Sequence, residues 1–220
     1  MSYIDLPVFF RGSRTYIQGS VILSLAAQVL INEGFIKDLC SAKLLKAKFN
    51  QISDKGVVLL SPGAVLGEDD LVLGEATFKD DSGVLTVQFV EDASVTPPRE
   101  EDRPSLIQDF TITEPLNGSC AYTIDTTLDD LLASVVEVVK ALHADLSDDV
   151  YDIWFTGFSG ASFSLDPSHI ANIGTIAVRN MMKKNAPDFI QTLFRITLSD
   201  EQSDKPSAFM LTFAYKTSKD

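Results

Sequence analysis

The sequence predicts an α+β protein made of two similar halves, each built from a long buried helix covered by a curved antiparallel sheet. Three observations support this prediction. A proline-rich, charged segment divides the 220 residues near the middle. Each half contains one long, almost continuously apolar run with helical period, and β-type runs follow it. This order of patterns is typical of antiparallel strands that pack around a central helix.

The dividing segment, residues 91–105, reads EDASVTPPREEDRPS and holds three prolines and seven charged residues. Prolines and a run of charges cannot supply a core element. We therefore expect a first repeat at residues 1–95, a linker at 96–105 and a second repeat at 106–220.

The two helical runs follow short β-prone pieces around Tyr16 and Tyr122. The first run is expected to end at Gly34, a typical glycine after a helix. The second is expected to begin at Thr127 with Asp130 three positions on, the spacing of a capping box. Both runs are apolar on most sides, which predicts burial. Their apolar positions are Val21, Ile22, Leu25, Val29 and Leu30 in the first run, and Leu128, Leu131, Leu132, Val135, Val136, Val139 and Leu142 in the second.

The β-type runs come after the helical runs. They are residues 43–52, 57–60, 71–79 and 84–90 in the first half, and 151–158, 161–165, 189–198 and 208–216 in the second. Turn residues at 53–56 and 80–83 predict that the runs pair as hairpins. The second half carries an extra stretch, IANIGTIAVRNMMKK at 170–184, which we expect to be helical.

This order of elements resembles the hot-dog fold of thioesterases and acyl-thioester dehydratases, with two copies in one chain. The resemblance implies a tandem (double) hot-dog: two long central helices, each wrapped by a curved antiparallel sheet, with the sheets joined edge to edge. Such joining also removes an exposed sheet edge. Two alternatives remain open. In the first alternative, the halves are unrelated α+β pieces with chance similarity. In the second, the fold is a cystatin-like sheet wrapped on a helix.

The resemblance also implies a site. The superfamily places its acyl-thioester between the two repeats, where a helix N-terminus offers backbone N–H groups to the thioester carbonyl. It implies Asp125 as the base or water-orienting group and Gln18 as a polar positioner. The residues expected to contact substrate are Tyr16, Gly19, Ser20, Thr126, Thr127, Trp154 and Phe158. The alternative is structural: Asp125 is a helix cap, and Gln18 and Ser20 form a turn and an N-cap.

Histidine is scarce, and this bears on the chemistry. Dehydratases of the superfamily need a histidine before the helix of one repeat. Neither His143 nor His169 lies at such a position. His143 lies near the end of the second helical run, where we expect it to complement the negative helix terminus. The two histidines and two cysteines also lack the spacing of metal ligands, and no cofactor is implied.

The aromatic run at 151–158 predicts a strand whose alternation places Trp154 and Phe158 on one face. Together they would line a hydrophobic tunnel. The alternative is that they cover core or a subunit contact.

The charge balance argues against a nucleic-acid binder, because 31 acidic residues outnumber 18 basic ones and give a net charge of -13. Local basic positions remain. Lys46 and Lys48 share one face of an expected strand, and Arg179 and Lys183 lie four apart on the expected extra helix. They are candidate contacts for a coenzyme A phosphate or an acidic carrier protein, or else ordinary surface residues.

No apolar stretch is long enough to span a membrane, and the first residues lack the pattern of a secretory signal, so we expect a cytoplasmic protein. We expect this protein to be a monomer or a homodimer. Two functions follow. The first is binding or processing of an acyl-thioester (acyl-CoA or acyl carrier protein), with thioesterase-like or dehydratase-like chemistry. The alternative is a non-catalytic hot-dog-like scaffold or accessory subunit in a protein complex or a lipid-related pathway.

Overall fold

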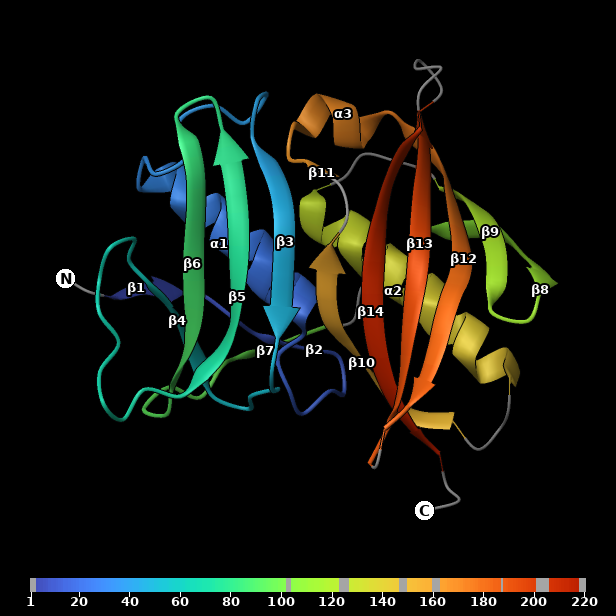
Figure 1. The fold of residues 1–220 in the computed structure, drawn as a ribbon, viewed down its shortest axis with the longest axis horizontal. Helices are drawn as coiled ribbons and strands as arrows, with labels where there is room; N and C mark the ends of the chain where they lie inside the picture. Colours follow the sequence, from blue (N-terminus) through green and yellow to red (C-terminus); the bar gives the residue numbers. More distant parts are fainter. Residues whose placement is uncertain are drawn as a thin grey trace.

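The computed structural model describes residues 3–101, 104–122, 127–146, 150–159, 163–186, 188–200 and 206–217. Most of the strands in these ranges form one large antiparallel sheet, and two long helices lie side by side against one of its faces (Figure 1). The strand order is β1-β4-β6-β5-β3-β10-β14-β13-β12-β9-β8. Strands from the first half of the chain therefore occupy one side of the sheet, and strands from the second half occupy the other.

The first half contains helix α1 (Gly19–Asn32) and most of one side of the sheet. Its strands are β1 (Tyr3–Leu6), β3 (Lys43–Phe49), β4 (Gly56–Leu60), β5 (Val72–Asp80) and β6 (Gly83–Asp92). The helix ends where expected, because Gly34 adopts a positive φ of 75° and its N–H donates to the carbonyl of Ile31 at 2.9 Å. Strands β2 (Phe10–Arg11) and β7 (Arg99–Glu100) form a separate parallel pair, so part of the expected linker is ordered against the first half.

The second half contains helix α2 (Leu128–Leu146) and the short helix α3 (Pro167–Ala171). Its strands are β8 (Ile107–Glu114), β9 (Asn117–Tyr122), β10 (Val150–Ser159), β11 (Phe163–Ser164), β12 (Ile173–Asn185), β13 (Ile190–Asp200) and β14 (Ser207–Thr217). Helix α2 begins with the expected capping box. The Thr127 N–H and hydroxyl donate to Asp130 Oδ2, and the Asp130 N–H donates to Thr127 Oγ1.

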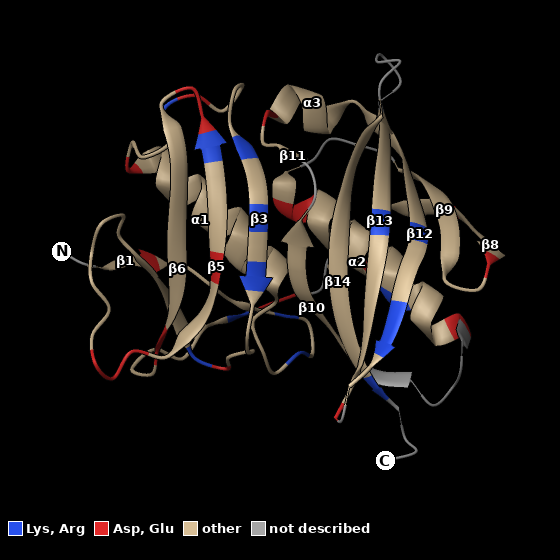
Figure 2. Ribbon diagram, in the orientation of Figure 1, with Lys and Arg blue, Asp and Glu red and all other residues tan. Residues whose placement is uncertain are grey.

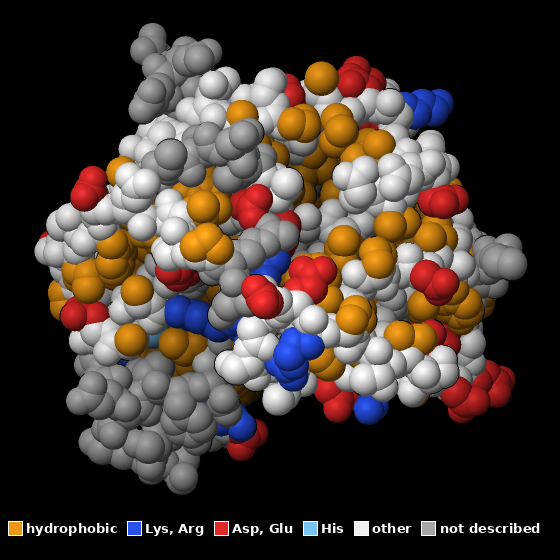
Figure 3. All heavy atoms as spheres, turned by 180° about the vertical axis from the view of Figure 1, so that it is seen from behind, with side chains coloured by type: hydrophobic (Ala, Val, Ile, Leu, Met, Phe, Trp, Pro, Cys, Tyr) orange, Lys and Arg blue, Asp and Glu red, His pale blue; other side chains and the backbone are white. Residues whose placement is uncertain are grey.

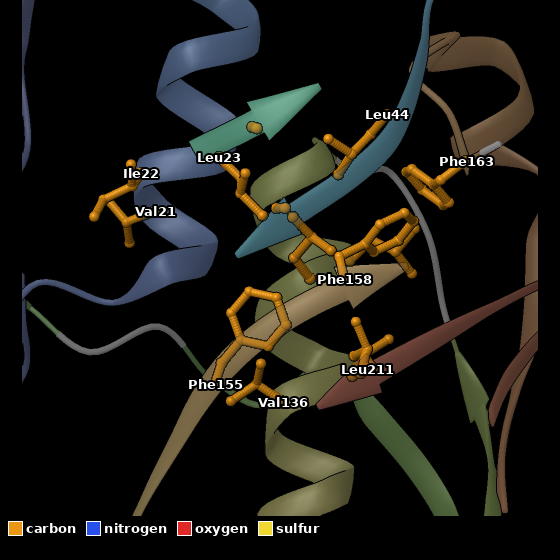
Figure 4. Packing of buried hydrophobic residues seen from close by; sticks show 14 of the residues in the cluster. Val21, Ile22, Leu23, Leu44, Val136, Phe155, Phe158, Phe163 and Leu211 are labelled. Atoms are coloured by element: carbon orange, nitrogen blue, oxygen red, sulfur yellow. The ribbon is translucent and has the colours of Figure 1, made fainter. Parts of the chain in front are cut away.

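The two halves meet within the sheet at β3 and β10. Their pairing is short, with Lys48 opposite Gly157 and Ala47 opposite Phe158, and β11 extends it along β3. Buried side chains from both halves pack behind this junction, where Phe155 and Phe158 of β10 lie between the helices and β14 (Figure 4). The core therefore continues across the junction, and neither half buries its apolar surface alone.

Three sequence predictions about the fold are wrong. The 170–184 stretch is not a helix: only Pro167–Ala171 is helical, and the rest forms β12 between β9 and β13. Its β-branched residues suit a strand paired on both edges, and that pairing overrides local helix preference. Residues 53–56 do not join a hairpin, because they carry the chain past β5 and β6 so that β4 pairs with β6 and β1. Tyr16 lies in a loop and not in a strand.

Candidate functional site

Two cavities lie beside the helix starts, and the first turn of α2 lines both of them through Asp129 and Asp130. The cavity beside the start of α1, here called the polar pocket, has a volume of about 260 Å³ and is lined by Arg11, Arg14, Gln18, Ser134, Glu137 and Lys140, among others. The cavity beside the start of α2, the apolar pocket, has a volume of about 370 Å³ and is lined chiefly by Val21, Leu25, Ile31, Leu128, Leu165 and Ile170.

Helices α1, α2 and α3 enclose the apolar pocket between them. The face of the molecule opposite to that in Figure 1 carries a hollow surrounded by apolar side chains, with acidic and basic side chains close together near the middle (Figure 3). A mostly apolar concave site with a few polar groups at one end is the usual form of a small-molecule site.

A buried ion pair separates the two pockets. Arg11 Nη2 lies 2.5 Å from Asp129 Oδ2, and the two side chains are only 5% and 10% exposed. Arg11 lines the polar pocket, whereas Asp129 lines the apolar pocket. Strand β2 holds Arg11 in place by pairing with β7, and the guanidinium also lies 5.6 Å from the centre of the Phe9 ring. The sequence marks Arg11 and Arg14 as basic residues before the first helix that could contact a coenzyme A phosphate or a carrier protein, but it does not predict the pairing of Arg11 with Asp129, which lies 118 positions away.

Gln18 occupies the N-cap position of α1, but its side chain does not cap the helix. Its Oε1 is buried and has no hydrogen-bond partner among the residues that the structure describes. The side chain lines the polar pocket and also a narrow cavity of about 20 Å³ that Tyr16, Trp154 and Phe155 border. Ser20 is buried in the first helical turn and is not the N-cap.

Gly19 serves packing. A Cβ built at this position would lie 2.8 Å from Phe49 Cε2 and 2.9 Å from Phe155 Cδ1. The space beside the glycine backbone, where we expected a substrate to approach, therefore holds two aromatic rings, one from each half of the sheet.

Replacing Gly19 by alanine is expected to lower the free energy of unfolding by about 1–3 kcal/mol, because the new methyl group overpacks a filled core. Urea unfolding followed by circular dichroism measures this. Gln28→Ala is the matched control: Gln28 is exposed on the same helix, and its change is expected to stay within about 0.5 kcal/mol. Equal stability of G19A and the parent protein would contradict the packing role.

At the start of α2, the structure describes Thr127 but not Asp125 or Thr126, which lie outside the described residues. Thr127 caps the helix through Asp130 and also lines the apolar pocket. Thr127 and Gln18 thus border different pockets, although Asp130 in the first turn of α2 lines the polar pocket together with Gln18. A catalytic role for Asp125 stays a prediction.

Trp154 and Phe158 both line an open cavity of about 490 Å³, but their side chains do not lie together on one face as the alternation predicted. A register shift between Phe155 and Gly157 in the β10–β14 pairing inserts an extra residue, which places Phe155 and Phe158 together in the core. Phe158 is 1% exposed and stacks on Phe209, with ring centres 4.9 Å apart. Trp154 instead packs against Phe189, with ring centres 6.3 Å apart.

The basic positions lie on strands. Lys46 and Lys48 are both exposed on β3, as the alternation predicted, and Lys46 Nζ lies 3.0 Å from Glu75 Oε1. Arg179 and Lys183 are on strand β12, not on a helix, and Lys183 Nζ lies 5.8 Å from the centre of the Tyr215 ring. Figure 2 marks basic residues in blue on strands β3, β12 and β13.

Comparison with solved structures identifies the fold. The chain is similar to GphF Dehydratase 1, with a TM-score of 0.54 and 8% identity over 98% of this chain and 92% of that one. It is also similar to the dehydratase domain of PpsC from Mycobacterium tuberculosis, solved in complex with C12:1-CoA, with a TM-score of 0.51 and 11% identity over 92% of this chain and 85% of that one. The fold is a hot-dog fold. No family model matches the sequence, and no curated protein matches it.

Neither histidine of this hot-dog chain is among the residues that line the two pockets. His143 is fully buried in α2, where Nδ1 lies 2.8 Å from the carbonyl oxygen of Val139 and Nε2 lies 3.0 Å from Thr192 Oγ1. Burial lowers the pKa of His143 to about 4, so the ring is neutral at pH 7. The expected role as a positive partner of the helix terminus is therefore wrong. His169 belongs to α3, and its Nε2 lies 3.2 Å from Ser207 Oγ.

Two further findings concern the described part of the hot-dog chain. No helix in it has the length and apolar character needed to cross a membrane. Among the same residues, no group of three or more His, Cys, Asp or Glu side chains is placed to hold a metal ion. The thiol of Cys120 is buried, which raises its pKa to about 11 and makes it a poor nucleophile.

Proposed function

We propose that this protein binds an acyl-thioester and holds the acyl chain in the apolar pocket between α1, α2 and α3. The observation that carries the proposal is the pocket itself. Its volume of about 370 Å³ falls in the range of small-molecule sites, and its walls are mostly aliphatic. Burial of a hydrocarbon chain against such walls contributes about 0.8 kcal/mol per methylene group.

The fold supports the same class of ligand. We infer a tandem hot-dog with repeats at residues 1–95 and 106–220, because β3 and β10 join the two sets of strands and each set covers one long helix. Among hot-dog proteins of similar structure, the PpsC dehydratase domain was solved with an acyl-CoA. The apolar pocket lies between the two long helices, and the polar pocket lies between α2, the segment before α1 and residues 104–106.

The residues at the pockets favour binding over dehydration. Dehydratases of this superfamily use a histidine before one helix, but in this chain an arginine, Arg11, precedes α1 and reaches the first turn of α2. Asp129 accepts a short hydrogen bond from Arg11 in a buried pair, so its Oδ2 is already occupied by a protein partner. Both histidines form hydrogen bonds outside the pockets, His143 with Thr192 and His169 with Ser207. Hydrolysis assisted by Asp125 remains compatible with the proposal.

The test is a binding experiment with dodecanoyl-CoA, read by isothermal calorimetry and thermal unfolding. We expect binding by the parent protein and at least a tenfold loss in Leu25→Trp, because the indole fills the apolar pocket. Val65→Trp is the matched control: Val65 is 85% exposed, so affinity should not change. Absence of binding to acyl-CoAs of every chain length, or equal affinity of L25W and the parent, would overturn the proposal.

Turnover is measured in the same samples. Release of free thiol from dodecanoyl-CoA that depends on the protein and disappears in Asp125→Asn would assign hydrolysis to Asp125. Formation of an enoyl product from a 3-hydroxyacyl-CoA would show dehydration. It would contradict the claim that the residues at the pockets, including the Arg11–Asp129 pair, favour binding over dehydration.

A further inference from the structure

We propose that the cavity at the junction of β3 and β10 is a second binding site, which takes a small aromatic anion such as an aryl carboxylate. This cavity, here called the junction cavity, has a volume of about 490 Å³ and is lined by Lys46, Lys48, Trp154, Thr156, Phe189 and Thr212, among others. It shares no lining residue with the apolar pocket or the polar pocket. The proposal therefore goes beyond acyl-thioester binding and does not depend on it.

The first argument is the way the two strands separate. In the described part of the chain, β3 and β10 pair at two positions and then diverge (Figure 1). Consecutive residues of both strands, 46–52 and 154–159, line the junction cavity. Because side chains alternate between the two faces of a strand, an unbroken run of lining residues shows that the cavity follows the strand edges. The junction cavity is therefore a gap between two splayed strands, and its volume falls in the range of small-molecule sites.

The second argument is an aromatic wall. Trp154 of β10 and Phe189, just before β13, are half-buried, and their ring centres lie 6.3 Å apart with the ring planes at 62°. Strand β14 lies between β10 and β13 and contributes only Ala214 and Thr212 to the described lining, so small side chains separate the two aromatic positions. Aromatic rings pack against other rings through their faces and edges. This wall therefore favours a ligand with a planar, apolar body.

The third argument is the charge of the opposite wall. Lys46 and Lys48 line the junction cavity, and no acidic side chain is among its described lining residues. Lys46 pairs with Glu75 at 3.0 Å, and Lys48 lies opposite the same Glu75 in the β3–β5 register, so the two lysines share one carboxylate. One positive charge is left over at this wall, in a chain whose net charge is -13. An anionic group complements it, whereas a cation would meet repulsion.

The experiment uses the intrinsic fluorescence of the protein, because Trp154 is the single tryptophan of the chain and lines the junction cavity. The probe is biphenyl-4-carboxylate, and biphenyl-4-carboxamide is its neutral counterpart. We expect the carboxylate to bind with a dissociation constant below about 1 mM, as the usual binding energy per atom gives for a ligand of this size. The Trp154 emission should shift to shorter wavelengths, because the bound ring displaces water. The carboxamide should bind roughly threefold to fivefold more weakly, the effect of one exposed charge pair.

Two variants test the two walls separately. Lys48→Gln should weaken the carboxylate roughly threefold to fivefold and leave the carboxamide unchanged. Its matched control is Lys43→Gln, since Lys43 is exposed on the same strand but does not line the junction cavity. Phe189→Ala should weaken both probes roughly threefold to tenfold, whereas Phe35→Ala, which truncates an exposed aromatic side chain elsewhere, should change neither. Lys48 is exposed, so K48Q tests the proposal even if F189A does not fold.

The outcomes separate this site from the acyl site. Saturating dodecanoate should leave the affinity for biphenyl-4-carboxylate unchanged, and competition between the two would overturn the proposal. Binding without a change in Trp154 emission, equal losses in K43Q and K48Q, or no binding at all would also overturn it. Dimers that the carboxylate dissociates, measured by sedimentation, would show that a second copy of the chain occupies the cavity instead. Failure to bind dodecanoyl-CoA would overturn the proposed function but not this proposal.

Discussion

Replacement of Arg11 by leucine is expected to lower the free energy of unfolding by about 3–5 kcal/mol. The substitution leaves the Asp129 carboxylate, whose side chain is 10% exposed, without its cationic partner. Removing one member of a buried pair is costly because the remaining charge has lost both its water and its counter-ion. Chemical denaturation at pH 7 measures the loss.

The double variant R11L/D129L is the decisive control. Replacing both buried charges with apolar side chains removes the desolvation cost of both, so we expect the double variant to recover most of the stability lost in R11L. Additive losses in the two single variants would show that the side chains do not interact as the structure places them. Full stability of R11L alone would contradict a buried pair.

Stability is expected to fall by about 2 kcal/mol between pH 7.5 and pH 5 because of His143 alone. Burial lowers the pKa of His143 to about 4 in the folded protein, whereas an exposed histidine titrates near 6.5. Between these two values the unfolded chain binds a proton that the folded protein does not. The contribution of His143 is therefore fully present above pH 6.5 and is lost as the pH falls towards 4.

His143→Gln isolates this contribution, since glutamine retains hydrogen-bonding capacity towards Thr192 but does not titrate. The difference in unfolding free energy between the variant and the parent protein, followed from pH 7.5 to 5, should shrink by about the same 2 kcal/mol. A difference that is independent of pH would mean that His143 takes up a proton equally well in both states.

The two helices, the end of α1 and the start of α2 can be predicted from the sequence alone. The apolar runs, the Thr127–Asp130 capping box and Gly34 are local signals, and each acts through atoms only a few residues apart. The 80–83 turn likewise fixes the β5–β6 hairpin. The order of elements is enough to indicate the hot-dog resemblance. A long apolar helix must be covered by a sheet, whichever strands pair to form that sheet. Strand β8, by contrast, has no strong pattern, since most of its side chains are exposed at the sheet edge, and it was missed.

Which residues meet at the candidate site depends on contacts that form only in the folded chain. The strand identity of β12 depends on neighbours on both edges, and the separation of Trp154 from Phe158 depends on a bulge that alternation cannot reveal. The ion pair joins residues 118 positions apart, and Gln18 lines a pocket that the segment before α1 forms with α2 and residues 104–106. These features arise from contacts between distant segments, and a local pattern carries no record of its distant partner.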